Sequence, residues 1–525
     1  MPSFGQVLGI EGTAWNLSAA VFDTDLIALV SRPYGPLHGG IHPREAAQHH
    51  ASVMNDLISS VLCDPEAITG IAFSRGPGLG PCLRTVATAA RSLALALDVP
   101  LAGVNHCVAH VEIGRFATGC RDPIVLYASG ANTQVIGYLN GRYRIFGETL
   151  DIGIGNALDK FARSKGLMHP GGPIIEQLAA TGTYTDLPYT VKGMDLAFSG
   201  LMSAAKESKA PLEDVCCSFQ ETAFAMCVEV TERAMSLAAK DEVLLVGGVG
   251  ANNRLQEMLR TMCEDRGAQF FVPEQKYLGD NGAMIAYTGK LMLESGQSLP
   301  IGSSQINPSY RADDVDVTWA GPQPAAVLQE CPPFRAGPAR GAEAIIEFEH
   351  GSAAKRRLSK RYRVPALDRR LIAERTRAEA RLIAAARHAG VPTPVMSDIT
   401  ADTIVMEQVE GTLLTQDLSV KNLQEAGRMV GRLHSAGIMH GDLTTGNMIM
   451  RDGRCVLIDF GLAQVTTEIE QRGVDIHVLF QTLESTTGDS AALKAAFCDG
   501  YQETFAGAGD VIAREHEIVL RGRYQ

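Results

Sequence analysis

The chain has 525 residues, too many for a single hydrophobic core, so its length predicts two to four domains. Its composition, 46% hydrophobic and 20% charged, excludes a disordered or low-complexity protein. The net charge of −12 argues against a protein that coats nucleic acid along its whole length, and DNA is not an expected partner. The charge is uneven, because the chain from Arg335 onward carries 24 basic and 25 acidic residues.

Membrane and secretory signals are not expected in this sequence. No apolar run approaches the roughly 20 residues needed to cross a bilayer, and the N-terminal stretch lacks a basic, cleavable leader. The 11 cysteines are scattered without a CxxC pair, which argues against a disulfide framework or a zinc ribbon. We therefore expect a cytoplasmic protein with no membrane partner.

Strands and helices alternate through roughly the first 320 residues, and the alternation begins twice. The first round predicts strands at 6–10 and 17–22 around a glycine turn, a helix at 44–62, a strand at 71–73 and a helix at 84–97. The second round predicts a strand, glycine turn and strand within 123–151, helices near 174–181 and 219–239, a strand at 243–246, a helix at 253–266 and a strand at 269–272. Two half-domains that each open with a β-hairpin predict a duplicated α/β fold with a cleft between its lobes.

Three glycine-bearing turns follow predicted strands in this part of the chain. They are GIEGTA (9–14), SGANT (129–133) and GGVGANN (247–253). Each alone is weak evidence, because any tight turn favours glycine. At the start of each lobe and after a late strand, they together indicate a site for phosphates and a nucleoside.

His106 and His110 lie four residues apart, so on a helix both imidazoles project from one face. They could be two structural histidines, or they could form part of a metal site. A zincin protease is disfavoured because Cys107 stands where HExxH requires a glutamate. Oxygen ligands could come from Asp280 and Tyr127, and such a mixed set would suit iron or zinc.

Eight motifs follow one another in order across residues 1–322: GIEGTAWNLSAAV, GGIHPREAAQHH, RGPGLGPCLR, NHCVAH, DIGIGNALDK, HPGGP, GGVGANNRL and GDNGAMIAY. Together they resemble the universal tRNA N6-threonylcarbamoyladenosine transferase family. The resemblance implies a duplicated actin/Hsp70-like ATPase fold. It also implies transfer of a threonylcarbamoyl group from threonylcarbamoyl-AMP to N6 of adenosine 37 in tRNAs that read codons beginning with A.

The resemblance further implies the residues of this site. The implied metal ligands, for one iron or zinc ion, are His106, His110, Tyr127 and Asp280. The implied contacts to the acyl-adenylate are Tyr127, Ala128, Ser129, Gly130, Ala131, Asp159, Gly172, Glu176 and Asn252. Asp159 and Glu176 would take ribose hydroxyls, and no general base is identified. The chain departs from the family at Ala131, where a glycine is usual, so that the added methyl group could crowd a phosphate.

A proline-rich seam at 320–341 separates a second domain, and we expect a linker at 323–336 and a domain at 337–525. HGDLTTGN at 440–447 and DFG at 459–461 match a protein-kinase catalytic loop and metal-binding motif in type and spacing. Asp442 would orient or deprotonate the acceptor, and Asn447 and Asp459 would hold Mg²⁺ on ATP.

Upstream, Lys355 fits the strand lysine that grips the phosphates, and Glu379 fits its helical ion-pair partner, although Lys360 is an alternative to Lys355. The phosphate-covering loop is degenerate and lacks GxGxxG; its residues are Gly341, Ala342, Glu343 and Ala344. No APE motif follows, and the 64 residues after Gly461 are too few for a complete C-terminal lobe.

Besides these departures, residues 337–525 contain the motifs RGAEAII, KRRLSKRYRVPALDRRL, RTRAEARLI, GVPTP, HGDLTTGNMI, DFGLA and RGRY. Together they resemble the small atypical kinase of the KEOPS complex, the p53-related protein kinase family. The resemblance implies a minimal bilobal kinase fold, Ser/Thr autophosphorylation, ATP hydrolysis that supports tRNA modification, and small KEOPS subunits as partners.

The stretch 355–387 carries 12 basic and three acidic residues, which is typical either of a solvated helix face or of a contact surface. With Arg521 and Arg523 it becomes a candidate surface for tRNA. The leading hypothesis is a fused transferase and kinase of one tRNA-modifying complex. The alternatives are a transferase whose kinase-like domain is chiefly a scaffold and, least favoured, a metalloprotease.

Overall fold

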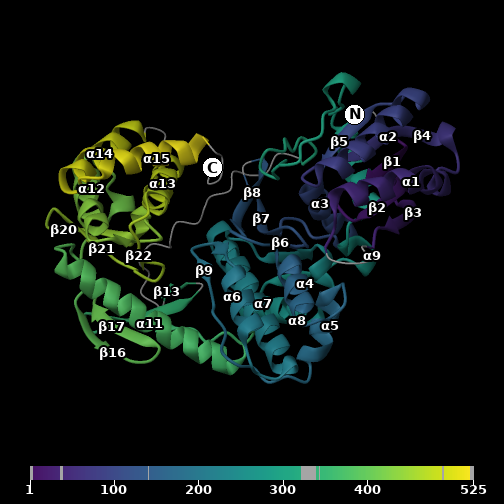
Figure 1. The fold of residues 1–525 in the computed structure, drawn as a ribbon. Coiled ribbons are helices and arrows are strands. Elements are labelled where there is room, and N and C mark those ends of the chain that lie inside the picture. The colour runs from purple at the N-terminus through teal and green to yellow at the C-terminus, as the bar shows by residue number, and fades with distance from the viewer. Residues whose placement is uncertain are drawn as a thin grey trace. The chain divides into compact units, whose positions relative to one another are not determined.

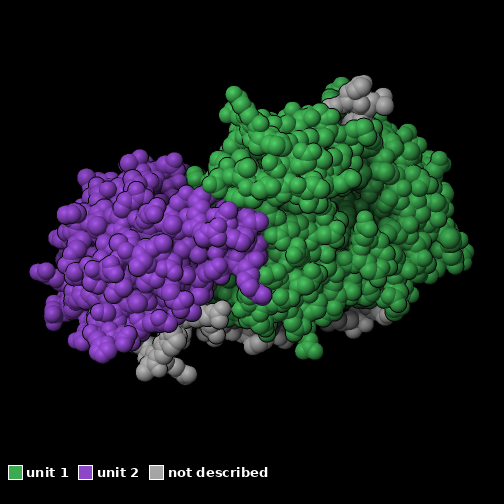
Figure 2. Space-filling view, turned by 90° about the horizontal axis from the view of Figure 1, so that it is seen from below, with its two compact units in different colours: residues 1–326 green, residues 327–525 purple. Residues whose placement is uncertain are grey.

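The computed structural model describes residues 4–35, 40–139, 141–320, 339–341, 343–487 and 490–520. The chain forms two compact units, residues 1–326 and 327–525 (Figure 2). The predicted linker 323–336 lies outside the described residues, as do Ala342, Arg521 and Arg523. Among the described residues, no helix is both long and apolar enough to cross a membrane.

The first sheet of unit 1 has the order β3-β2-β1-β4-β5. Its strands are β1 (Gln6–Glu11), β2 (Asn16–Phe22), β3 (Leu26–Pro33), β4 (Ile68–Gly76) and β5 (Leu101–Asn105). The first three pair antiparallel, whereas β4 runs parallel to β1 and β5 parallel to β4. Both faces of β1 are buried, because Leu8 and Ile10 belong to one core cluster and Val7 to another. Helices α1 (Pro43–Val61) and α2 (Gly80–Leu97) contribute to the first of these clusters.

The second sheet has the order β12-β11-β6-β7-β8. Its strands are β6 (Ile124–Ala128), β7 (Thr133–Leu139), β8 (Arg142–Glu148), β11 (Glu242–Val246) and β12 (Gln269–Phe271). If the strands of each lobe are numbered from one to five along the chain, both sheets have the spatial order 3-2-1-4-5. The second sheet therefore repeats the topology of the first. The prediction of a duplicated actin/Hsp70-like fold is confirmed.

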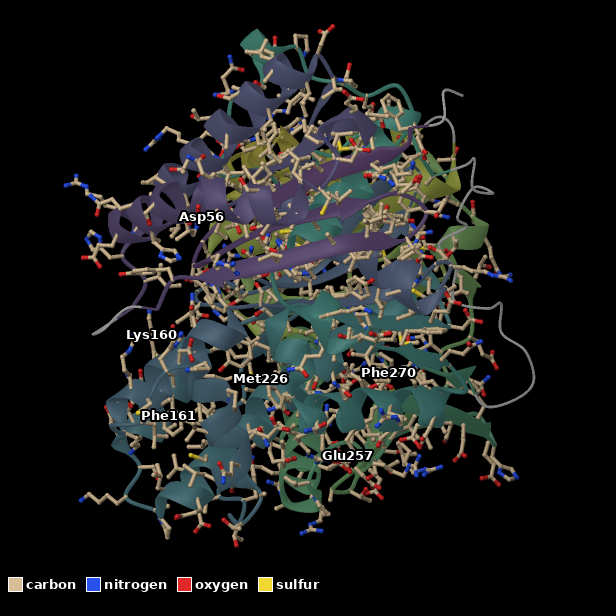
Figure 3. The ribbon with its side chains drawn as sticks, turned by 90° about the vertical axis from the view of Figure 1, so that its right-hand side faces the viewer. Asp56, Lys160, Phe161, Met226, Glu257 and Phe270 are labelled. Carbon is tan, nitrogen blue, oxygen red and sulfur yellow. The ribbon has the colours of Figure 1, made fainter. Side chains whose placement is uncertain are left out.

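Helices of the second lobe gather beside this sheet (Figure 1). They are α4 (Ile154–Ser164), α5 (Gly171–Ala179), α6 (Ser199–Glu207), α7 (Leu212–Ala238) and α8 (Asn253–Arg266), with a small hairpin of β9 (Val191–Lys192) and β10 (Asp195–Leu196). Phe161 of α4 stacks on Phe219 of α7 with ring centroids 4.9 Å apart. Figure 3 labels Phe161 and the fully buried Met226 inside this lobe, whereas Asp56 and Glu257 lie on exposed positions of α1 and α8.

Two further helices meet at the first sheet, α3 (His106–Thr118) and α10 (Gly282–Glu294). Helix α3 begins directly after β5, and the side chain of Asn105 accepts a hydrogen bond from the backbone N–H of Val108 at its start. Helix α10 lies so close to β1 that a Cβ on Gly9 would stand 2.2 Å from the backbone nitrogen of Ala286. This close approach requires glycine on the strand.

Unit 2 begins with an antiparallel sheet of order β13-β14-β15-β17-β16 and the long helix α11 (Pro365–His388). The strands are β13 (Ala339–Arg340), β14 (Ala344–Glu349), β15 (Ser352–Arg357), β16 (Met396–Ile399) and β17 (Thr403–Glu407). A helical lobe follows, with α12 (Val420–Ser435), α13 (Ile469–Thr486), α14 (Ala491–Thr504) and α15 (Ala508–Leu520) (Figure 1). The short strand β18 (Thr412–Leu413) precedes α12, and β19 (Ile438–Met439), β20 (Met448–Arg451), β21 (Arg454–Leu457) and β22 (Gln464–Val465) lie between α12 and α13. This arrangement confirms the predicted minimal bilobal kinase-like fold.

Candidate functional site

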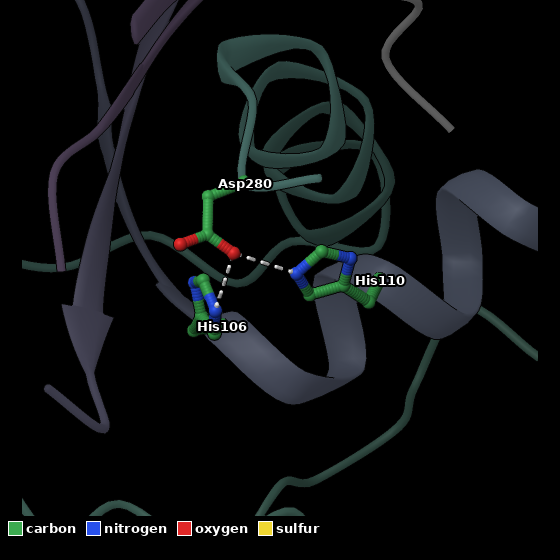
Figure 4. A group of neighbouring side chains, drawn as sticks. All are labelled: His106, His110 and Asp280. Carbon is green, nitrogen blue, oxygen red and sulfur yellow. Dashed lines mark hydrogen bonds and ion pairs between the residues drawn. The ribbon is translucent and has the colours of Figure 1, made fainter. Parts of the chain in front are cut away.

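Three side chains of unit 1 converge on one point, where their candidate ligand atoms all lie within 4.8 Å of one another. His106 and His110 come from successive turns of α3, and Asp280 comes from the loop before α10. The Oδ1 atom of Asp280 lies 3.4 Å from Nε2 of His106 and 3.2 Å from Nε2 of His110 (Figure 4). The two imidazoles therefore project from one face of α3, as their spacing predicted, and both face one carboxylate oxygen of Asp280.

Tyr127, the remaining predicted ligand, lies near the end of β6 with its ring centroid 5.0 Å from that of His110. Burial raises the pKa of its hydroxyl, and the nearby Cys107 and Asp280 raise it further, while hydrogen bonds with Ser129 and Asn132 act in the opposite direction. Tyr127 thus connects the histidine cluster with the turn that follows β6.

The donor set fits a divalent transition metal. Two imidazole nitrogens and a carboxylate oxygen are ligands that iron and zinc accept. Burial lowers the pKa of His106, but the carboxylates of Glu11 and Asp280 outweigh it and raise that pKa to about 10. Burial raises the pKa of Asp280, but the two histidines outweigh it and hold the pKa below its usual range. The cluster is therefore built to hold positive charge, and a cation would take the place of the proton.

The turn after β6 is held against the start of α4. The backbone N–H groups of Gly155 and Asn156 donate to the carbonyls of Ser129 and Gly130, at 3.1 and 2.9 Å. The φ angle of Ala131 does not lie in the positive range, so alanine is accommodated there without backbone strain. The backbone of this turn therefore tolerates the alanine, and the crowding of a phosphate by its methyl group stays a prediction.

The third glycine turn lies beside the second. Gly247 has a φ of 94°, and a Cβ there would stand 2.4 Å from the carbonyl oxygen of Ala128. Two of the three predicted phosphate-binding turns therefore converge at the ends of β6 and β11, as expected for neighbouring parallel strands.

The other predicted contacts to the acyl-adenylate lie on α4, on α5 and at the start of α8, and three of the four have protein partners. Asp159 accepts the backbone N–H of Gly171 at 2.7 Å. Glu176 accepts two hydrogen bonds from Asn253, at 2.8 and 3.1 Å. Asn252 caps α8 with its oxygen and donates to Gln220 at 3.0 Å, so this residue serves first to hold the turn. Gly172 has open space around its α-carbon.

In unit 2 a buried lysine lies between two carboxylates. Nζ of Lys355, on β15, is 2.6 Å from Oε1 of Glu379 on α11 and 2.6 Å from Oδ1 of Asp459. Burial lowers the pKa of Lys355, but Asp459 and Glu379 outweigh it and raise that pKa. Lys360 instead donates its backbone N–H to Asp368. The geometry therefore favours Lys355 over Lys360 as the phosphate-gripping lysine.

The catalytic-loop residues lie together as well. Nδ2 of Asn447 donates to the Oδ2 atom and to the carbonyl oxygen of Asp442, both at 2.9 Å. Asp459 has a φ of 61° and accepts the backbone N–H of Gly461 at 3.1 Å. Burial, and then the charge of Asp459, raises the pKa of Asp442. A raised pKa suits a group that exchanges a proton with an acceptor hydroxyl.

The degenerate loop is fixed by ion pairs rather than by glycines. The carboxylate of Glu343 lies 3.1 Å from Arg357, and Arg357 also lies 2.5 Å from Glu379. Gly341 donates its N–H to the carbonyl of Ala344 at 2.9 Å. Glu343 is thereby connected to the lysine–glutamate pair.

Several residues that support these sites were not identified from the sequence. On α13, Asp475 accepts the backbone N–H groups of His440 and Gly441 at 2.7 and 2.8 Å, which fixes the catalytic loop. On α3, Glu112 accepts from Tyr143 at 2.6 Å and from Trp319 at 2.8 Å. A single acid within a helix gives no sequence signal for such a role.

Comparison with known proteins identifies the class of each unit. Residues 27–287 match the family model TsaD: tRNA N6-adenosine threonylcarbamoyltransferase, and residues 344–476 match the RIO domain model. The chain therefore combines a domain of the threonylcarbamoyltransferase class with a RIO kinase domain, both of which use ATP-related, metal-dependent chemistry.

Relatives of the same length carry both domains. The probable bifunctional tRNA threonylcarbamoyladenosine biosynthesis protein of Methanoculleus marisnigri is 70% identical over 524 residues, covering 100% of this chain and 99% of that protein. The proteins of the same description from Methanospirillum hungatei and Halobacterium salinarum are 68% and 48% identical, each over 99% of both chains. The chain belongs to this family of bifunctional tRNA threonylcarbamoyladenosine biosynthesis proteins, which confirms both resemblances.

Proposed function

We propose that residues 1–322 transfer the threonylcarbamoyl group from threonylcarbamoyl-AMP to N6 of adenosine 37 in tRNAs that read codons beginning with A. Residues 337–525 act as an ATP-using Ser/Thr kinase or ATPase that regulates or supports this reaction, and residues 323–336 link the two. The observation that carries the proposal is the cluster of His106, His110 and Asp280, joined through Tyr127 to the turn after β6.

In the transferase, His106, His110 and Asp280 would hold the iron or zinc ion, with Tyr127 beside them. When bound, the ion supplies Lewis-acid polarisation of the acyl oxygens. The backbone amides of the 129–133 turn would bind and orient the acyl-adenylate, and Asp159 and Glu176 would accept hydrogen bonds from ribose hydroxyls. AMP would leave as the tRNA amine forms its new bond to the carbamoyl carbon.

In the kinase domain, Asp459 and Asn447 would hold Mg²⁺ against the phosphates of ATP, and Lys355 would neutralise phosphate charge. Asp442 would orient the acceptor, either a Ser/Thr hydroxyl or water. Positioning and charge compensation then account for most of the catalysis, because phosphoryl transfer requires little covalent help from protein groups.

Some basic side chains of the stretch 355–387 are buried in ion pairs inside unit 2. Lys355, Arg357 and Arg363 are 6–7% exposed and pair with Glu379 or Asp368. The exposed basic side chains of the stretch include Arg361, Arg369, Arg377 and Arg381. We propose that this exposed subset contacts tRNA phosphates, in a cytoplasmic assembly with small KEOPS subunits.

A direct assay tests the proposal. The full chain, its small partners, threonylcarbamoyl-AMP and a tRNA that reads A-starting codons are incubated, and the digested tRNA is analysed for threonylcarbamoyladenosine by mass spectrometry. The proposal predicts the modified nucleoside, and its absence with an active donor and partners present would overturn it.

A further inference from the structure

A buried carboxylate that the proposed function leaves without a role lies behind the histidine cluster. Glu11 is the last residue of β1, inside the GIEGTA turn, and its side chain is 0% exposed. Burying a carboxylate costs free energy of desolvation unless both of its oxygens are hydrogen-bonded. Its partners therefore indicate what the fold uses it for.

Both carboxylate oxygens of Glu11 accept hydrogen bonds. Oε1 accepts the backbone N–H of Thr13 at 2.8 Å and the Thr13 hydroxyl at 2.6 Å. Oε2 faces Nδ1 of His106 at 3.2 Å. The same Nδ1 lies 3.4 Å from the Thr13 hydroxyl oxygen, which can also accept from it. Both neighbours of Nδ1 are thus acceptors, so the proton on this imidazole belongs on Nδ1.

A proton fixed on Nδ1 leaves a lone pair on Nε2 of His106. This lone pair points toward Asp280, where the metal ion would bind. The other histidine has no such support, because Nδ1 of His110 is buried and has no hydrogen-bond partner among the described residues. The two imidazoles therefore differ: one is oriented by a carboxylate, and the other is placed by its helix and by packing against Tyr127.

We propose that Glu11 is the positioning residue of the metal centre and that it acts by holding His106 in the Nδ1–H tautomer. The inference rests on the proposed metal site. Carboxylates behind metal-bound histidines typically contribute 10- to 100-fold in metal affinity, by fixing the ring and raising its basicity.

Replacement of Glu11 by glutamine isolates this role, because the side chain keeps its size and loses one acceptor. The backbone N–H of Thr13 is a fixed donor, so the amide oxygen of glutamine must face Thr13. The amide NH₂ must then face Nδ1 of His106, which favours a proton on Nε2 and opposes metal binding. Asp at this position would keep two acceptor oxygens on a shorter side chain.

The experiment measures the affinity of the metal-free full chain for Zn²⁺ and Co²⁺ by competition with a chromophoric chelator. We expect Glu11→Gln to weaken binding by about 10- to 100-fold, and Glu11→Asp to weaken it less. Thr13→Val keeps the backbone N–H but removes the hydroxyl, which donates to Oε1 of Glu11 and lies 3.4 Å from Nδ1 of His106. Because Oε2 of Glu11 still faces Nδ1, this variant serves as the matched control and should show the smallest loss. Melting temperatures of the metal-free variants report on folding.

Double variants separate positioning from general damage. In a His106→Ala background, Glu11→Gln should cause no further loss, whereas in a His110→Ala background it should keep its full effect. Equal losses in both backgrounds, unchanged affinity in the single variant, or Glu11→Asp binding as weakly as Glu11→Gln would overturn the inference. If the parent chain bound no metal, or if His106→Ala had no effect, the proposed metal site itself would fail instead.

Discussion

The two candidate sites of this chain differ in the source of their positive charge. In the kinase site Asp459 meets a permanent cation of the protein, Lys355, which a second carboxylate, Glu379, holds in place. In the transferase site the described residues give Asp280 two imidazoles, those of His106 and His110, which are cationic only when protonated. A lysine therefore neutralises the carboxylate of the kinase site, whereas in the transferase site a metal cation would replace the imidazole proton. The comparison predicts different responses to removing single residues.

The largest effect should follow from removing a ligand at the cation-dependent site. We expect His106→Ala to lower metal affinity and formation of the modified nucleoside by at least about 100-fold, because two donors remain where three converged. Metal content after dialysis and the nucleoside assay measure both. His49→Ala, at a histidine that instead contacts the carbonyl of Arg32, is a matched control. Normal activity of a metal-free His106→Ala protein would contradict a role for the cation in the reaction.

At the kinase site, Asp459→Ala should leave the ion pair of Lys355 and Glu379 intact and remove a proposed ligand of Mg²⁺. ATP turnover should fall by about 100-fold or more, while metal binding by unit 1 stays unchanged. Asp398→Ala, an exposed acid on β16, is the control. Turnover that survives Asp459→Ala would assign the kinase domain a scaffolding role instead.

Glu379→Gln tests whether the kinase site is held together by its own charges. The substitution leaves Lys355 and Arg357, both nearly buried, without the carboxylate that they share. Loss of one partner from a buried ion pair costs about 3 kcal/mol, so the thermal transition of unit 2 should move to lower temperature. Calorimetry of the full chain should show that transition moving alone. A shift of both transitions would contradict an independent site.

The smallest effect concerns a histidine beside the first glycine turn. His50 donates from Nε2 to the carbonyl of Ala14 at 3.0 Å, and burial lowers its pKa to about 4 from its usual 6.5. Because the pKa of His50 is lower in the folded than in the unfolded chain, its contribution to stability is complete above pH 6.5. That contribution is lost as the pH falls from 6.5 toward 4. The melting temperature of unit 1 should drop by about 2 °C more in the parent than in His50→Gln over that range. Equal drops would show that His50 is not a buried neutral group.

Much of the fold could be predicted from the sequence because periodicity and glycine turns are local signals. The first β-hairpin and helix α8 were predicted within one or two residues, and the second hairpin lies within the predicted range 123–151. The predicted helix at 219–239 begins earlier, at Leu212, because Cys216 and Cys217 gave no clear periodicity. Strands β3 and β8 and helices α4, α6 and α10 were not predicted.

The residues of the candidate sites also divide into those with a local sequence signal and those without one. Residues inside motifs, such as His106 and Asp459, could be proposed from the sequence because the chemistry requires a fixed spacing. Residues that act through a partner distant in the sequence were not. Glu11 is separated from His106 by 95 residues, and Asp475 from His440 by 35 residues. The contact that gives each its role exists only after folding.

The most direct test of cation-assisted transfer compares the parent chain with His106→Ala in a single turnover of threonylcarbamoyl-AMP on tRNA, with the small partners present. We expect threonylcarbamoyladenosine from the parent and almost none from the variant, with both proteins melting at similar temperatures when metal-free. Equal product from the two, or none from the parent with an active donor, would contradict cation-assisted transfer.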